Sequence, residues 1–242
     1  MRIALAAAVI AASTATSACG QTRSEDGGPM VARNYTVGGF DQIEVAGPYN
    51  VQVRTGANVS VAARGPQNVI EHMVVEVRGN KLLIHPAERK GWFHRGWHYR
   101  GKVELTVTVP QLRGAAIAGS GDINVDQVKG DRFEGAIAGS GSLGVNTIDV
   151  ATLKLSIGGS GDTRVGGGRA QRADYAIAGS GDIDARNVQT QNADVSIAGS
   201  GSIAAQAAGT ADVSIMGSGD VEVTGGAKCS ISKAGSGSVR CS

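Results

Sequence analysis

The tripeptide Gly-Ser-Gly returns at a nearly fixed spacing through the second half of this sequence and limits the folds open to it. Successive triplets are 20, 20, 20, 20, 18 and 18 residues apart, and a fixed period in this range is typical of a stacked repeat architecture. Each triplet predicts a structural turn, because glycine reaches positive φ without a Cβ clash. The turns begin at Gly119, Gly139, Gly159, Gly179, Gly199, Gly217 and Gly235.

Apolar residues alternate with small or polar residues on both sides of each triplet. Isoleucine stands two positions before the triplet in every copy except the last, and Ile, Leu, Val or Thr stands four positions after it. Period-two alternation around a glycine turn predicts strand, turn and strand. One such pair cannot bury its own apolar face, so successive coils must stack. The predicted fold is all-β: a parallel β-helix, or β-solenoid, whose coils lie about 4.8 Å apart.

Composition agrees with a packed β fold and excludes several other classes. Hydrophobic residues make up 41% of the 242 residues and charged residues 18%, so the chain is not disordered. The 37 glycines do not recur every third residue, which excludes collagen. A net charge of only +2 gives no reason to expect nucleic acid as a partner. No triplet continues as a phosphate-binding loop, and calcium-binding solenoids use a shorter repeat, so we expect no cofactor.

The N-terminal residues resemble an export signal. Residues 1–18 run from Arg2 through an apolar stretch to small residues, the order of a signal peptide. The sequence Thr-Ser-Ala-Cys that ends at Cys19 resembles a bacterial lipobox, so we expect lipidation of Cys19. A plain secretory signal, which would leave Cys19 as a spare thiol, is the alternative. Gly20 resembles the outer-membrane class of lipoproteins, and residues 19–33 are typical of a flexible tether.

Two further cysteines, Cys229 and Cys241, lie in the last repeat. An exported protein meets an oxidising compartment, and with lipid on Cys19 these two cysteines are left to pair as a disulfide. Both occupy inward columns of the final coil, where a disulfide would staple the end of the array. In the same coil Lys233 replaces the core isoleucine, so this coil can face water as a cap.

Residues 34–113 are less regular than the repeats of residues 114–242 but alternate in the same way. Val45 and Val51 flank a turn at Gly47 in the register that the later repeats use. We expect residues 34–113 to form wider, imperfect coils of the same solenoid, with a separate small β domain as the alternative.

Two motifs resemble those of the head GIN domain proteins, a bacterial family described as autotransporter adhesins. One is Phe-Asp-Gln-Ile-Glu-Val-Ala-Gly at residues 40–47, and the other is Ile-Ala-Gly-Ser-Gly-Asp-Ile at residues 117–123 and 177–183. The resemblance covers nearly all of residues 38–242. It implies a right-handed β-helix in the cell envelope and supplies no catalytic residues.

One segment, residues 89–102, breaks both the period and the alternation. It holds both tryptophans of the protein and five basic residues, with no acidic residue among them. We expect a loop off the solenoid, and such loops carry function more often than scaffolds do. The candidate contacts for a ligand or partner are Trp92, Phe93, His94, Arg95, Trp97, His98 and Tyr99.

Three binding roles are open for this loop, beside a purely structural one in which it folds back over the solenoid. Its aromatic rings suit a cell-surface glycan or a protein partner. Its basic residues suit anionic lipid headgroups or lipopolysaccharide phosphates. His94 and His98 could hold a metal, but no neighbouring Cys, Asp or Glu completes a ligand set, so we expect no metal site.

These features predict a non-enzymatic cell-envelope lipoprotein that acts as an adhesin-like binding module, in the periplasm or at the cell surface. One alternative is a structural protein whose solenoid ends associate with copies of itself. Another is a polysaccharide-active β-helix enzyme, which would need clustered carboxylates on an outer face. Asp122, Asp162 and Asp182 can stack in one column but lack a partner base, so we expect no catalytic residues. The regular outer columns of Ala and Ser could match a periodic ligand, although tight corners explain small residues more simply.

Overall fold

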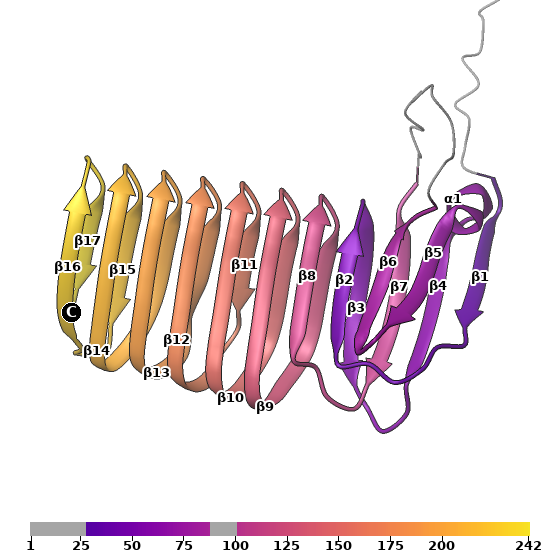
Figure 1. Ribbon diagram of the computed structural model, residues 1–242, viewed down its shortest axis with the longest axis horizontal. Coiled ribbons are helices and arrows are strands. Elements are labelled where there is room, and N and C mark those ends of the chain that lie inside the picture. The colour runs from indigo at the N-terminus through magenta and orange to yellow at the C-terminus, as the bar shows by residue number, and fades with distance from the viewer. Residues whose placement is uncertain (1–27, 88–100) are drawn as a thin grey trace, which may run out of the picture.

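The computed structural model describes residues 28–87 and 101–242. All of its strands join in one sheet, which coils into a β-solenoid, as the repeats predict (Figure 1). In chain order the elements are β1 (Met30–Tyr35), β2 (Gln42–Ala46), β3 (Tyr49–Thr55), β4 (Ser60–Pro66), α1 (Gln67–Glu71), β5 (Met73–Arg78), β6 (Lys81–Pro86), β7 (Val103–Val109), β8 (Gly114–Gly119), β9 (Asp122–Gly139), β10 (Ser142–Gly159), β11 (Asp162–Val165), β12 (Gly168–Gly179), β13 (Asp182–Gly199), β14 (Ser202–Gly217), β15 (Asp220–Thr224), β16 (Lys228–Ala234) and β17 (Ser238–Cys241).

The regular repeats stack in parallel and in the register that the triplets predict. Ile137 of β9 pairs with Ile157 of β10, twenty residues later, and the pairing continues along both strands. Between β13 and β14 the offset falls from twenty residues to eighteen, through register shifts at residues 185–192. The two missing residues are therefore absorbed at the bend that lies opposite the glycine corners.

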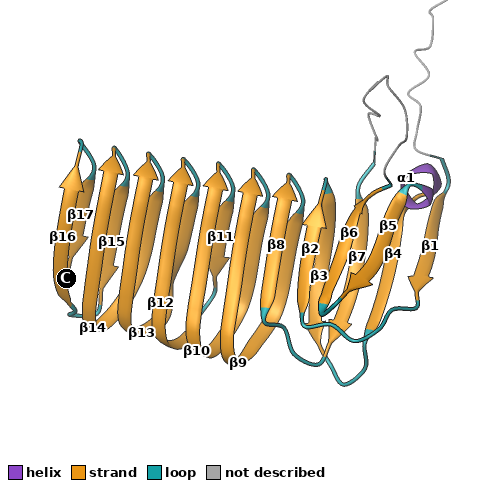
Figure 2. Cartoon of the chain, in the orientation of Figure 1, coloured by secondary structure: helices purple, strands orange, loops and turns teal. Residues whose placement is uncertain are grey.

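The Gly-Ser-Gly triplets form one edge of the solenoid. Figure 2 shows short loops along this edge, while at the opposite edge the strands bend with little interruption. The first glycine of every triplet has φ between +123° and +139°, a conformation that side chains disfavour. The third glycine is packed as tightly: a Cβ on Gly121 would lie 2.6 Å from the carbonyl oxygen of Gly47 in the neighbouring coil. Both positions therefore need glycine for steric reasons.

A narrow apolar core runs between the two faces of each coil. It is built from inward columns of Ile, Val, Leu and Ala, and Tyr175 and Phe133 are its largest fully buried side chains. Because the columns repeat coil after coil, each side chain packs on its equivalents above and below.

The Tyr175 hydroxyl is buried and finds no hydrogen-bond partner among the residues that the structure describes, and burial raises the pKa of this phenol. An unpaired buried hydroxyl costs about 1–3 kcal/mol. We therefore expect Tyr175→Phe to stabilise the protein by about 1 kcal/mol in urea unfolding. Thr190→Val is the matched control, because the buried Thr190 hydroxyl donates to the Gln206 carbonyl at 2.6 Å and its loss should destabilise. A destabilised Tyr175→Phe variant would contradict the expectation.

The first half of the chain builds its coils out of chain order. β6 and β7 stack in parallel on β2 and β3, with Ile43 opposite Leu82 and Val51 opposite Leu105. On their other side β2 and β3 stack in parallel on β8 and the first part of β9. The coil made by β6 and β7 is therefore the outer neighbour of the earlier coil made by β2 and β3.

Beyond this outer coil the pairing changes, and it differs from the imperfect coils that we expected for residues 34–113. β5 pairs with β6, β4 with β7 and β1 with β4, and all three pairs are antiparallel. The Gly79-Asn80 turn joins β5 to β6 directly, and so short a connection permits only an antiparallel pair. The expected tether is also too long, because its residues 30–33 belong to β1 and pair with β4.

A side-chain contact joins the irregular half to the repeats. The Asp126 carboxylate, next to the bend of β9, accepts hydrogen bonds from the Thr55 amide at 3.0 Å and the Thr55 hydroxyl at 3.1 Å. Thr55 is the last residue of β3. This carboxylate therefore fixes the end of β3 against the first regular coil.

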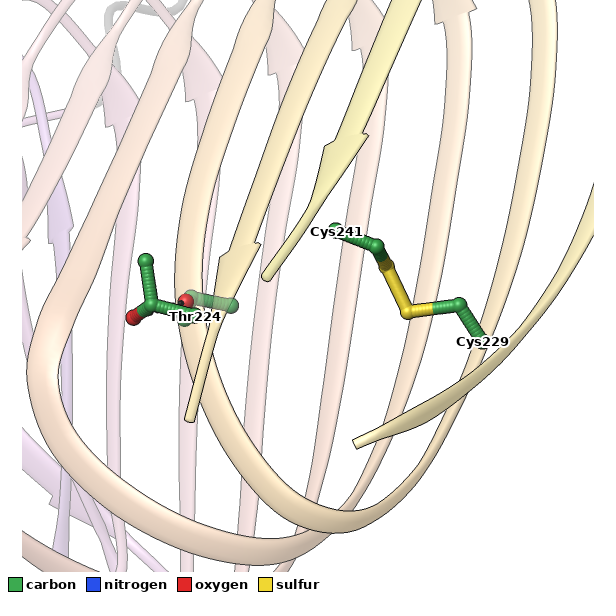
Figure 3. The surroundings of a disulfide bond; sticks show 4 residues. Thr224, Cys229 and Cys241 are labelled. Atoms are coloured by element: carbon green, nitrogen blue, oxygen red, sulfur yellow. Dashed lines mark hydrogen bonds between the residues drawn. A yellow bond between two sulfur atoms is a disulfide. The ribbon is translucent and has the colours of Figure 1, made fainter. Parts of the chain in front are cut away.

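The C-terminal coil ends the array. Cys229 of β16 and Cys241 of β17 form a disulfide, with their Cα atoms 6.7 Å apart, and it links the two strands of this coil (Figure 3). Lys233 stands in the column of core isoleucines, and its ammonium donates a hydrogen bond to the Gly237 carbonyl at 2.8 Å. An inward-pointing charge of this kind discourages another strand from pairing at an open edge. The final coil therefore has the properties of a cap.

Candidate functional site

In the sequence the expected contact loop falls between β6 and β7, and the end of β6 and the start of β7 lie at the corner edge of the solenoid. The structure describes its last two residues, Gly101 and Lys102. In the neighbouring coil the equivalent connection, between β2 and β3, is the two-residue turn Gly47-Pro48. The connection between β6 and β7 is therefore much longer than the corner in the neighbouring coil. The following predicted site residues lie outside the described residues: Cys19, Trp92, Phe93, His94, Arg95, Trp97, His98 and Tyr99.

Two parts of the chain that are distant in sequence meet at the start of α1. The Pro29 carbonyl, where the chain enters the fold, accepts a hydrogen bond from the Gln67 amide at 3.0 Å. Gly101, at the end of the inserted segment, packs so closely on Pro66 that a Cβ would lie 2.5 Å from its Cγ. Pro29, at the N-terminal entry, and Gly101, near the end of the insertion, therefore contact two adjacent residues, Gln67 and Pro66.

The other end of the insertion lies at the same helix. Ala87 donates its amide hydrogen to the carbonyl of His72, directly after α1, at 2.7 Å. α1, β1 and the adjoining ends of β6 and β7 lie together at one end of the solenoid (Figure 1). This convergence was not predicted from the sequence, because no local pattern shows which distant segments flank a short helix.

Acidic residues of the repeats bond to the next coil. Asp122 accepts the Ser142 amide hydrogen at 3.1 Å. Asp220 accepts hydrogen bonds from the Ser238 hydroxyl at 2.6 Å and the Ser238 amide at 3.1 Å, and these bonds lower the pKa of the Asp220 carboxyl. Each of these carboxylates accepts a hydrogen bond from the next coil. This structural role is sufficient to explain why an acidic residue occurs at each position.

Other acidic residues on the outer faces form ion pairs with arginines. The Arg169 guanidinium donates to both oxygens of Asp149 in the preceding coil, at 2.9 and 2.8 Å, and holds the pKa of that carboxyl below its ordinary value. Asp184 has Arg186 at 2.8 Å and Arg164 at 3.8 Å. Within residues 28–87 and 101–242, no three His, Cys, Asp or Glu side chains are grouped so that they could hold a metal ion.

A polar groove of about 580 Å³ lies where the irregular half meets the repeats. It is lined by the first residues of β2, β6 and β8 and by the second half of β9, which bring Gln42, Lys81, Arg113 and Arg132 to one place. These groove residues were not predicted from the sequence either. A comparison of outward columns could have found them, once β8 is known to stack on β2.

The fold and these surfaces define a β-solenoid scaffold with outward-facing contact surfaces. The chain belongs to the head GIN domain family: residues 39–227 match the family described as "Putative auto-transporter adhesin, head GIN domain". This confirms the resemblance found in the sequence. Membership indicates an exported or cell-surface protein. No helix in the described part of the chain is long and apolar enough to cross a bilayer.

Solved structures share the fold over most of its length. A "putative adhesin" from Bacteroides fragilis has a TM-score of 0.78 and 25% identity, over 88% of this chain and 97% of that one. A "Putative lipid binding protein" from Parabacteroides distasonis has a TM-score of 0.69 and 25% identity, over 89% and 97% of the two chains. A search of the curated proteins finds no match. The family and these two proteins are named for adhesion or lipid binding, and none of them is named as an enzyme.

Proposed function

We propose that this protein is a non-enzymatic, adhesin-type binding module of the bacterial cell envelope. In this proposal lipid on Cys19 holds it to a membrane, with the outer membrane favoured by Gly20, and residues 89–102 contact the anionic surface of that membrane. The observation that carries the proposal is the convergence of Pro29 and Gly101 on Pro66 and Gln67.

Chain length limits how far this end of the solenoid lies from the anchor. Pro29 is ten positions after Cys19, and an extended chain spans at most about 3.6 Å per position, so the two residues are at most about 36 Å apart. One end of the aromatic and basic segment is packed beside the point where this tether enters the fold. The anchor would therefore keep the segment near the membrane surface and leave the C-terminal coil farther away.

The composition of the segment suits an anionic interface. A cationic side chain close to an anionic bilayer contributes about 1 kcal/mol. Tryptophan and tyrosine favour the headgroup region, where their rings are partly buried and their polar atoms stay hydrated. The similar protein from Parabacteroides distasonis is named as lipid-binding, which supports lipid contact in preference to a glycan or protein contact at this segment.

Vesicle co-sedimentation tests the membrane contact. The chain from Gly20 onward keeps every described residue and should bind phosphatidylglycerol-containing vesicles more tightly than phosphatidylcholine vesicles. Replacing residues 91–101 with a Gly-Ser linker removes Arg95, Arg100 and both tryptophans, so anionic binding should fall at least about tenfold. Equal binding by this variant, or no binding by the parent chain, would contradict the proposal.

A control variant removes the same number of cations elsewhere. Arg164→Gln with Arg240→Gln neutralises two exposed arginines of the repeat face and should leave vesicle binding within about twofold, because neither lies at the α1 end.

The lipid anchor at Cys19 is tested separately. Mass spectrometry of the mature N-terminus should show a diacylglyceryl cysteine at Cys19, and Cys19→Ser should release the protein from the membrane fraction.

A further inference from the structure

The groove at the junction is hollow because its floor carries unusually small residues. Gly114 and Ala116 of β8 lie beside Gln42 and Glu44 of β2 in the outward columns, and Ala136 of β9 follows Ala116. β8 therefore forms the floor of the groove, and the longer side chains of β2 on one side and β9 on the other form its walls. The resulting volume of about 580 Å³ is within the usual range for small-molecule sites.

One side of the groove is held in place by hydrogen bonds and ion pairs. The Asn80 amide donates to the Asp41 carboxylate at 2.7 Å, and the Arg113 guanidinium lies 3.7 Å from the same carboxylate. The backbone joins them as well, since the Arg113 amide donates to the Asp41 carbonyl at 2.7 Å. Groups fixed in this way lose little conformational freedom when a ligand binds.

The groove also offers polar groups on both of its sides that are not engaged. The side chains of Gln42, Asp131 and Arg132 have no hydrogen-bond or ion-pair partner among residues 28–87 and 101–242. They provide an amide, a carboxylate and a guanidinium, and so both donors and acceptors, around one hollow.

The charges of the groove indicate the class of ligand. Three cationic side chains (Lys81, Arg113 and Arg132) face three carboxylates (Asp41, Asp131 and Glu134), so the lining is close to neutral overall. None of the described residues that line the groove is aromatic, so they provide no ring on which an apolar ligand could stack. A ligand without net charge whose many hydroxyls both donate and accept hydrogen bonds fits this lining best.

We propose that the groove binds a short, uncharged saccharide. This inference rests on the non-enzymatic binding role proposed above and gives that role a ligand class, but it uses none of the residues of the membrane-contacting segment. The groove and the segment are therefore separable by mutation.

The first test is a glycan array of neutral and anionic oligosaccharides, probed with the chain from Gly20 onward. The best neutral glycan is then titrated by calorimetry. Ala136→Gln fills the groove, and Arg132→Gln removes an unpaired donor from its wall; each should weaken binding at least tenfold. Ala176→Gln and Arg172→Gln are matched controls in the same outward columns two coils away, and should bind within twofold of the parent chain.

Two results would overturn the proposal: retention of no neutral glycan, whether or not anionic glycans are retained, or unchanged binding by both groove variants. Unfolding midpoints equal to that of the parent chain show that the variants are folded, which is expected because these side chains lie at the surface. Vesicle binding by the groove variants should stay unchanged. Failure of the saccharide site and failure of the membrane contact are thereby distinguished.

Discussion

Replacing Gly159 with alanine should destabilise the protein by about 3–5 kcal/mol, one of the largest effects expected for a single methyl group in this chain. Gly159 opens a triplet with φ of +131°, a region that is strained by about 1–3 kcal/mol for residues with a side chain. In addition, the new Cβ would collide with the Gly139 carbonyl oxygen of the preceding coil. That oxygen accepts the Ser160 amide at 2.9 Å, so it cannot move away without breaking an inter-coil hydrogen bond.

The neighbouring glycine provides the control. Gly158 lacks a positive φ, and the nearest heavy atom to a Cβ placed there is the Ile137 carbonyl oxygen, 3.8 Å away. Alanine occupies the equivalent position at Ala138 and Ala178. Gly158→Ala should therefore be neutral, or stabilising by up to about 1 kcal/mol through the unfolded state. Urea unfolding of both variants is the measurement, and similar free energies of unfolding would show that the corners do not need glycine.

The same reasoning explains how much of the repeat half was predictable. A glycine corner and period-two alternation occur in every coil, so the sequence of each coil is enough to define its register. Alignment of the triplets therefore predicts the observed pairing of Ile137 with Ile157. The β-solenoid and the family were therefore identified correctly from residues alone. The site of the two-residue shortening was not, because the bend at residues 185–192 has no fixed sequence marker.

The irregular half was less predictable for a physical reason. Parallel and antiparallel strands share the same period of two, so alternation in β1, β4 and β5 indicates strands but not their partners. The Asp126 contact with Thr55 and the placement of β6 and β7 beyond β2 and β3 depend on long-range packing. The groove has the same origin, because a small residue such as Gly114 makes a hollow only in relation to its neighbour Gln42 in space.

Removal of the Cys229–Cys241 disulfide should loosen the C-terminal coil while the rest of the solenoid stays folded. The two cysteines are twelve residues apart, and closure of a loop of this length stabilises by about 3 kcal/mol in the chain-entropy model. In a stacked array each coil contacts only its neighbours, and within the described part of the chain β16 and β17 pair on one side only, with β14 and β15. The lost free energy should therefore appear locally, as fraying of the last coil.

Hydrogen exchange in the double variant Cys229→Ser, Cys241→Ser measures this directly. Amides of β16 and β17 should exchange about a hundredfold faster than in the parent chain, since about 3 kcal/mol corresponds to that factor, whereas amides of β9 and β10 should be unchanged. Reduction of the parent chain with dithiothreitol should reproduce the effect. Fraying also uncovers the strand edge of β14 and its buried Ile215, so the variant should self-associate at lower concentration than the parent chain. Unchanged exchange in β16 and β17 would mean that the Lys233 contact and backbone pairing alone hold the cap, and that the disulfide adds little to it.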